Sequence, residues 1–223
     1  MATPKGIVML KKIQLTAVSL VLLLIAACSS DTQSVPQLTP QQISQLYNPA
    51  GNTILGNPNG GVTVVEIFDY QCPYCRKMVP IMQKLVKANP NVRVVFKEIL
   101  LFGPTSEPST EAALAAQQQG KYLAMHTALL SAPQPLDNEK IMQIAKNLKL
   151  DTKKLMIAMT SSGIKQQIQQ NTELADDLNI TAAPVFIIAN SNIATNPQAK
   201  TKQLMLVGEA SLDKLQQLIA KVK

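Results

Sequence analysis

The apolar residues of this chain form continuous runs in some segments and helical repeats in others. Two runs rich in β-branched residues, Val62 to Phe68 and Val92 to Ile99, are typical of strands buried on both faces. Between them, apolar residues recur at helical spacing from Cys75 to Val86, and Asn89-Pro90 ends the pattern. A strand, a helix and a strand of these lengths predict a right-handed βαβ unit with a parallel strand pair.

Helical and strand patterns alternate again in the second half of the chain. Residues 107–180 keep helical spacing and contain no strand pattern, so they predict an all-helical insertion. Two apolar runs within residues 181–223 predict an antiparallel hairpin, and an amphipathic helix follows them. Because residues 51–106 and 181–223 both form strands, we expect one composite α/β domain around the helical insertion.

The N-terminal segment predicts export. Residues 1–27 combine three lysines, a short apolar run and small residues before Cys28, which is the layout of a signal peptide. The segment "LIAAC" resembles a bacterial lipobox, which implies cleavage before Cys28 and a lipid anchor on that cysteine. Ser29, as the next residue, implies the outer membrane. An ordinary signal peptide that leaves Cys28 free is the alternative.

Residues 28–50 predict a polar tether that ends in a short helix. The first part is rich in Ser, Asp, Thr, Gln and Pro, which is typical of a flexible linker. Thr39, Pro40 and Gln42 then form the pattern of a helix start, with a capping residue, a proline and a partner for the cap.

Charge excludes one class of function. The 223 residues include 21 basic and 14 acidic side chains, a formal net charge of +7. Removal of residues 1–27 takes away three lysines and leaves +4, since 21 − 3 − 14 is 4. The remaining basic residues are scattered and have few aromatic neighbours, so we expect no nucleic-acid partner.

The segment "EIFDYQCPYCR" brings two cysteines to the start of a predicted helix. Unpaired N–H groups and the helix dipole stabilise a thiolate there, so the pKa of Cys72 is expected to fall from about 8.5 to roughly 3.5 to 7.5. Cys75 lies one helical turn later, within disulfide reach. A zinc site lacks ligands, because His126 is the single histidine and no second cysteine pair exists. A structural disulfide across so short a loop adds little stability, so a redox-active pair is favoured.

Three segments, "FDYQCPYC", "GPTSEPSTEAALAAQQQGKYLAMHTALL" and "TAAPVFI", closely resemble the DsbA-like thiol:disulfide oxidoreductases of the thioredoxin superfamily. The resemblance implies an α/β thioredoxin fold with an inserted all-helical domain. It also implies Cys72 as the nucleophile, Cys75 as the buried resolving thiol, and no metal or bound cofactor.

The resemblance assigns further residues near the pair. Pro184 matches a cis-proline beside the cysteines, and Ala183 before it would offer backbone hydrogen bonds to an extended substrate; a trans proline at a strand start is the alternative. Glu66 matches a buried acid that exchanges a proton with the resolving cysteine, or else it is a surface-facing strand residue. The dipeptide Pro73-Tyr74 lacks the histidine that the strongest oxidants commonly carry at the second position, which predicts a less oxidising pair.

The sequence thus predicts a periplasmic, lipid-anchored enzyme that forms disulfides in exported proteins through Cys72 and Cys75. A DsbB-like membrane partner would reoxidise it. The nearest alternative is a disulfide isomerase or reductase kept reduced by a DsbD-like partner. A non-catalytic peptide-binding lipoprotein of the same fold is the alternative from another class, and the presence of both cysteines argues against it.

Overall fold

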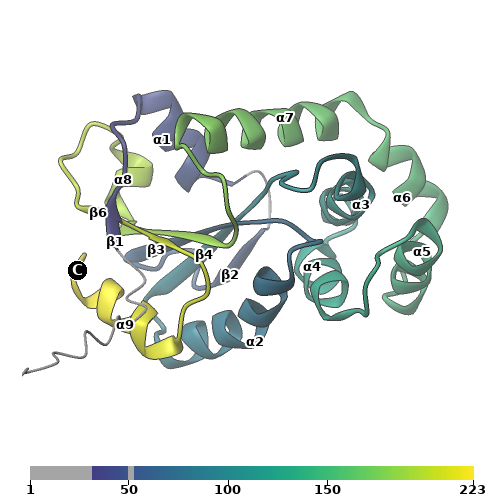
Figure 1. Ribbon diagram of the computed structural model, residues 1–223, viewed down its shortest axis with the longest axis horizontal. Helices are drawn as coiled ribbons and strands as arrows, with labels where there is room; N and C mark the ends of the chain where they lie inside the picture. Colours follow the sequence, from purple (N-terminus) through teal and green to yellow (C-terminus); the bar gives the residue numbers. More distant parts are fainter. Residues whose placement is uncertain (1–31, 50–52) are drawn as a thin grey trace, which may run out of the picture.

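A six-stranded mixed sheet forms the centre of the computed structural model, which describes residues 32–49 and 53–223 (Figure 1). The predicted signal peptide 1–27 and the predicted lipidation site Cys28 lie outside these residues. The strand order is β1-β6-β5-β3-β4-β2. The strands are β1 (Thr32–Ser34), β2 (Ile54–Gly56), β3 (Val62–Phe68), β4 (Val92–Glu98), β5 (Val185–Asn190) and β6 (Gln203–Val207).

Helices cover both faces of the sheet and extend beyond one end of it. Figure 1 shows α2 and α9 below the sheet, α1, α7 and α8 above it, and α3 to α6 grouped to one side. The helices are α1 (Pro40–Tyr47), α2 (Pro73–Ala88), α3 (Glu107–Gln117), α4 (Tyr122–Ser131), α5 (Asn138–Asn147), α6 (Thr152–Met159), α7 (Ser162–Asp177), α8 (Asn192–Thr195) and α9 (Leu212–Ala220), and a 3₁₀ turn, η1 (Gly103–Thr105), precedes α3. None of the helices within these described ranges has both the length and the apolar character that a bilayer span requires.

The central position of β3 in the sheet explains why this strand is almost entirely apolar. It pairs in parallel with β4 and antiparallel with β5, and all seven of its residues are buried. Val64 and Phe68 pack toward the core that contains α2 and α4, whereas Val65 and Ile67 pack toward the core under α1 and α7. The predicted βαβ unit and the doubly buried strand are therefore confirmed.

The predicted start of α1 is confirmed in detail. The backbone N–H of Gln42 donates to the Thr39 hydroxyl at 3.2 Å, and the Gln42 side-chain oxygen accepts from the Thr39 N–H at 2.8 Å. Pro40 occupies the first turn. This reciprocal cap satisfies two N–H groups at the start of the helix that otherwise lack partners.

Two short elements differ from the sequence prediction. Thr32–Ser34, expected to be flexible tether, form strand β1 against β6. All three residues are exposed, so backbone pairing alone defines this strand and no apolar pattern reveals it. The hairpin from β5 to β6 is confirmed, but its polar loop contains the four-residue helix α8, whose Ile193 is fully buried.

Helix α7 belongs to the helical region and to the sheet at once. Its first half follows α6, whereas Leu174, Ala175 and the following Leu178 lie in the core over β3 and β5. The helical insertion is thus continuous with the layer that covers one face of the sheet.

Candidate active site

Cys72 occupies the capping position at the start of α2. Strand β3 ends at Phe68, a short turn follows, and the Cys72 N–H donates to the Asp69 carbonyl at 3.1 Å. Cys72 has extended backbone angles, φ −73° and ψ 119°, and Pro73 begins the helix. A capping side chain accepts hydrogen bonds from the second and third N–H groups of its helix, here those of Tyr74 and Cys75. The Cys72 side chain makes no capping hydrogen bond of ordinary geometry, but the N–H groups of Tyr74 and Cys75 face its sulfur and lower its pKa.

The two thiols have opposite electrostatic environments. Both are free, with Cys72 2% exposed and Cys75 fully buried. A hydrogen bond from the Cys75 thiol lowers the pKa of Cys72 from 9.0 to about 6, against burial, and the N–H groups of Cys75 and Tyr74 lower it further. The same thiol pair interaction, followed by burial, raises the pKa of Cys75 far above its usual range. Cys72 is thus the thiolate at neutral pH and Cys75 its protonated donor.

The loop before β5 lies directly against Cys72. The Ala183–Pro184 peptide bond is cis, as the resemblance implied, which excludes the trans alternative. The Cys72 sulfur lies 3.3 Å from the Ala183 carbonyl oxygen, to which it donates a hydrogen bond when it is protonated. Across the loop, the Gly208 N–H donates to the Pro184 carbonyl at 2.8 Å. The Ala183 N–H makes no backbone hydrogen bond to any described residue and stays available to an extended chain.

Glu66 is buried in the middle of β3, so the surface-facing alternative is wrong. Its side chain is 2% exposed, and burial, followed by the negative charge of Cys72, raises its pKa from 4.5 to about 8. Glu66 and His126 line a cavity of about 30 Å³ between α2 and α4. That volume is sufficient for one water molecule. The carboxyl thus has a pKa close to neutrality, and it interacts electrostatically with both cysteines.

The dipeptide between the cysteines faces outward. Pro73 is exposed, and the Tyr74 ring is 54% exposed with the Lys77 ammonium 5.0 Å from its centroid. Lys77 in turn forms a 2.7 Å salt bridge with Glu209, in the loop after β6. Because Glu209 neutralises Lys77, this lysine adds little positive charge at the thiolate.

Asp69, the first residue after β3, organises the site. Its carboxylate accepts from the Gln71 N–H at 2.7 Å, the Phe102 N–H at 3.1 Å and the Ser106 hydroxyl at 2.8 and 2.7 Å. These bonds join the cysteine loop to the segment between β4 and α3. The sequence signal was "GPTS" at residues 103–106, which entered the resemblance without an assigned partner.

A buried aromatic cluster supports the cysteine loop from below. His126 packs against the rings of Phe68 and Phe96, with centroids 4.9 and 4.2 Å away, and its Nδ1 lies 3.2 Å from the Tyr70 hydroxyl. Burial lowers the pKa of His126 to about 3, so it is neutral. Tyr122, in the same cluster, donates a hydrogen bond to the buried Glu98 carboxylate. Sequence reasoning did not single out this network, because its members lie on three separate segments.

Metal-binding chemistry has no candidate ligand set in the described segments. Among residues 32–49 and 53–223, no group of three or more His, Cys, Asp or Glu side chains could hold a metal ion. Cys72 and Cys75 instead form a hydrogen bond with each other, and Cys72 also contacts the Ala183 carbonyl. The arrangement suits exchange between two thiols and a disulfide.

Solved structures of similar fold cover most of this chain. A thioredoxin-like oxidoreductase from Silicibacter pomeroyi DSS-3 is 36% identical, with a TM-score of 0.70 over 80% of this chain and 95% of the other. The thiol-disulfide exchange protein alpha-DsbA2 from Wolbachia pipientis has a TM-score of 0.69 at 24% identity, covering 82% and 94% of the two chains, and shows the fold alone. The predicted thioredoxin fold with a helical insertion is confirmed.

Sequence relatives extend the comparison. The Na(+)/H(+) antiporter NhaA 3 of Salinispora tropica is 29% identical over 143 residues, 63% of this chain, and the chain spans only 22% of that protein's length. The thiol:disulfide interchange protein DsbA of Bordetella parapertussis is 25% identical over 171 residues, 74% of this chain and 81% of that protein. The family model of the DSBA-like thioredoxin domain matches residues 63–220. The chain therefore belongs to the DsbA-like thioredoxin-domain family of thiol:disulfide oxidoreductases.

Proposed function

We propose that this protein forms disulfide bonds in exported proteins through a Cys72–Cys75 redox pair. The observation that carries the proposal is the capping position of Cys72, where two N–H groups and the Cys75 thiol stabilise its thiolate. A stabilised thiolate is a good leaving group, so the reduced enzyme is favoured over its disulfide form. A pair that prefers to be reduced oxidises its substrates.

The exchange has two steps. A substrate thiolate attacks the Cys72 sulfur of the enzyme disulfide, and Cys75 leaves as a thiolate that takes a proton from Glu66, whose pKa of about 8 keeps it protonated at neutral pH. A second substrate thiolate then attacks the substrate sulfur of the mixed disulfide, and Cys72 leaves as a thiolate. The substrate loses two electrons and gains a disulfide, while the enzyme gains the two electrons as the Cys72 thiolate and the Cys75 thiol, and Glu66 regains its proton from water.

Substrate binding uses backbone and apolar contacts around Cys72. The free N–H and the carbonyl of Ala183, beside the cis Pro184, suit an extended peptide that adds a short strand. Tyr74 and Phe102 are 54% and 48% exposed, and the Phe102 N–H is bonded to Asp69 next to the cysteine loop. Exposed rings of this kind favour the apolar segments of incompletely folded proteins.

The cellular setting belongs to the same proposal. A lipid on Cys28 would anchor the enzyme to the periplasmic side of a membrane, with Ser29 favouring the outer membrane. Reoxidation of Cys72 and Cys75 would require an electron acceptor in the inner membrane, such as a DsbB-like protein. The location rests on the sequence pattern of residues 1–29, and it agrees with the exported substrates that disulfide chemistry requires.

The equilibrium constant of the cysteine pair against glutathione tests the direction of exchange. If the pair is an oxidant, oxidised glutathione converts only a small fraction of the reduced Cys72/Cys75 pair to the disulfide. The enzyme disulfide in turn oxidises an equimolar amount of a reduced, unfolded substrate. Cys72→Ser is expected to abolish the reaction, and Cys75→Ser to accumulate a mixed disulfide at Cys72. A Cys72/Cys75 reduction potential as low as that of a structural disulfide, together with efficient refolding of a substrate with scrambled disulfides, would support the isomerase or reductase. That result would overturn the oxidant proposal.

A further inference from the structure

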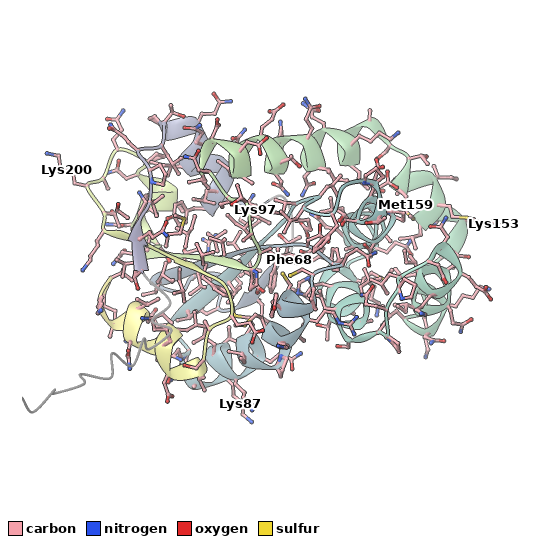
Figure 2. All side chains as sticks on the ribbon, in the orientation of Figure 1. Phe68, Lys87, Lys97, Lys153, Met159 and Lys200 are labelled. Carbon is pink, nitrogen blue, oxygen red and sulfur yellow. The ribbon has the colours of Figure 1, made fainter. Side chains whose placement is uncertain are left out.

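A polar cavity of about 290 Å³ lies between α1 and α7, on the face of the sheet opposite α2. Lys97 of β4 and Asn171 of α7 are its buried residues. The glutamines of its lining are Gln45, Gln166, Gln167 and Gln170. Val95 and Ile99 flank Lys97 along the chain and pack in the core under α1 and α7, so Lys97 projects to that face. Figure 2 labels Lys97 between α7 and the sheet.

Lys97 is a buried cation without a bonding partner. Its side chain is 8% exposed, and it forms no hydrogen bond or ion pair with any residue in the described ranges. Glu98 attracts it at a distance, but the Glu98 carboxylate is bonded by the Tyr122 hydroxyl and, at 3.5 Å, by the Asn171 amide. An ammonium that is largely removed from water and left unpaired is costly, so an anion in the cavity would stabilise it.

The cavity walls supply neutral hydrogen-bonding groups to complement that charge. The side chains of Gln45, Gln166, Gln167 and Gln170 make no hydrogen bonds to described residues, so both the donor and the acceptor of each amide are available. Gln45 and Gln167 are half-buried, whereas Gln166 and Gln170 are exposed at the rim. Among the described residues that line it there is neither a carboxylate nor an aromatic ring.

We propose that this cavity binds a small polar carboxylate, its charge paired with Lys97 and its hydroxyl or amide groups bonded to the glutamine side chains. A single ammonium matches a single negative charge, and the absence of an arginine from the lining disfavours a phosphate dianion, which prefers bidentate donors. The glutamine walls favour a ligand with several hydrogen-bonding groups over an apolar acid. Burial lowers the pKa of Lys97 to about 8, so the ammonium stays mostly charged at neutral pH.

Carboxylates and neutral analogues of the same molecules, compared in pairs, measure how much the negative charge of the ligand contributes to binding. The mature chain is titrated calorimetrically with gluconate and with N-acetyltriglycine, and separately with sorbitol and with N-acetyltriglycine amide, which lack the carboxylate. Sodium chloride holds the ionic strength constant. We expect at least one carboxylate to bind and its neutral counterpart to bind about tenfold more weakly or not at all.

Variants of two lysines tie the binding to this cavity. Lys97→Met keeps the length of the side chain without its charge, and it is expected to weaken carboxylate binding about tenfold or more. Lys165→Met, on an exposed position of α7 outside the cavity lining, is the control and should bind as the wild type does. Without ligand, Lys97→Met should unfold at the wild-type temperature or above it, because an unpaired buried charge is gone.

Three results would overturn the proposal. These are the absence of binding by both carboxylates, equal binding of a carboxylate and its neutral counterpart, and carboxylate binding that survives in Lys97→Met. A lower unfolding temperature for ligand-free Lys97→Met would show that Lys97 has a structural role instead. Insulin reduction by Lys97→Met is measured beside these tests, and unchanged activity separates a failure of this site from a failure of the proposed redox function.

Discussion

Replacing Glu66 by glutamine tests whether its carboxyl carries the proton of Cys75. Glutamine preserves the shape of the side chain but neither gains nor loses a proton. With a pKa of about 8, only about one carboxyl in ten is ionised near pH 7. If the ionised form takes the proton of Cys75 when that thiol attacks a mixed disulfide, the wild-type rate should rise about tenfold between about pH 7 and pH 9 as Glu66 ionises.

The assay is the release of a bound peptide from the Cys72 mixed disulfide, followed as a function of pH. We expect Glu66→Gln to be slower by about a hundredfold, which is the lower range of general base catalysis, and to lose the inflection near 8. A rate and pH profile identical to those of the wild type would refute the proton-transfer role. A uniformly slower rate that keeps the inflection would assign that inflection to another group.

Stability gives a second measurement of the same carboxyl. Because the native pKa of about 8 exceeds the usual 4.5, the native protein holds a proton that the unfolded chain releases. The free energy of unfolding of the wild type therefore falls as pH rises from about 4.5 to about 8, and at pH 7 it has fallen by about 3 kcal/mol. Glutamine does not ionise, so the free energy of unfolding of Glu66→Gln does not fall in this way. The stability of reduced Glu66→Gln relative to wild type should increase from about pH 5 to pH 7 in urea unfolding. A constant difference would contradict the burial of a protonated carboxyl.

Three further substitutions probe the capping cysteine, the Asp69 junction and the start of α1. Tyr74→His places an imidazolium near the thiolate, so the ultraviolet titration of Cys72 should shift from about 6 to lower pH by about one pH unit; an unchanged midpoint would show that the exposed ring is too distant. Ser106→Ala removes a hydroxyl donor from the buried Asp69 carboxylate and should cost about 2 kcal/mol in denaturant unfolding, and a loss near zero would mean that water replaces the donor. Thr39→Ala should cost about 1 kcal/mol in the same measurement, with full stability retained only if the cap of α1 contributes nothing.

The sequence predicted the parts of the fold whose signals are local. A continuous pattern of apolar residues marks each of β3, α2 and β4. The type and order of these elements could therefore be predicted from the sequence. Strand β1 was not predicted, because its three exposed residues pair only through the backbone with β6, more than 160 residues away. The short α8 was missed because a single buried side chain, Ile193, holds it in a polar loop.

The candidate site divides in the same way. The two cysteines and Glu66 stand within one segment of the sequence, and the family resemblance implied that Glu66 is buried. The contact of Cys72 with Ala183 spans 111 residues and came only from the family resemblance. The hydrogen bond that Ser106 donates to Asp69 and the one between Tyr70 and His126 were not foreseen, because either partner alone is an ordinary polar residue.

The sequence by itself determined the chemistry of this protein: a strand that ends at two cysteines, with the first at a helix N-terminus where backbone N–H groups favour a thiolate. Only the tertiary structure decided by how much the pKa values of the reacting groups shift. Burial raises the pKa of Glu66 to about 8, and the Cys75 thiol helps to lower that of Cys72 to about 6. The physical reason is that desolvation and hydrogen bonding depend on which segments meet, and distant segments meet only in the folded chain.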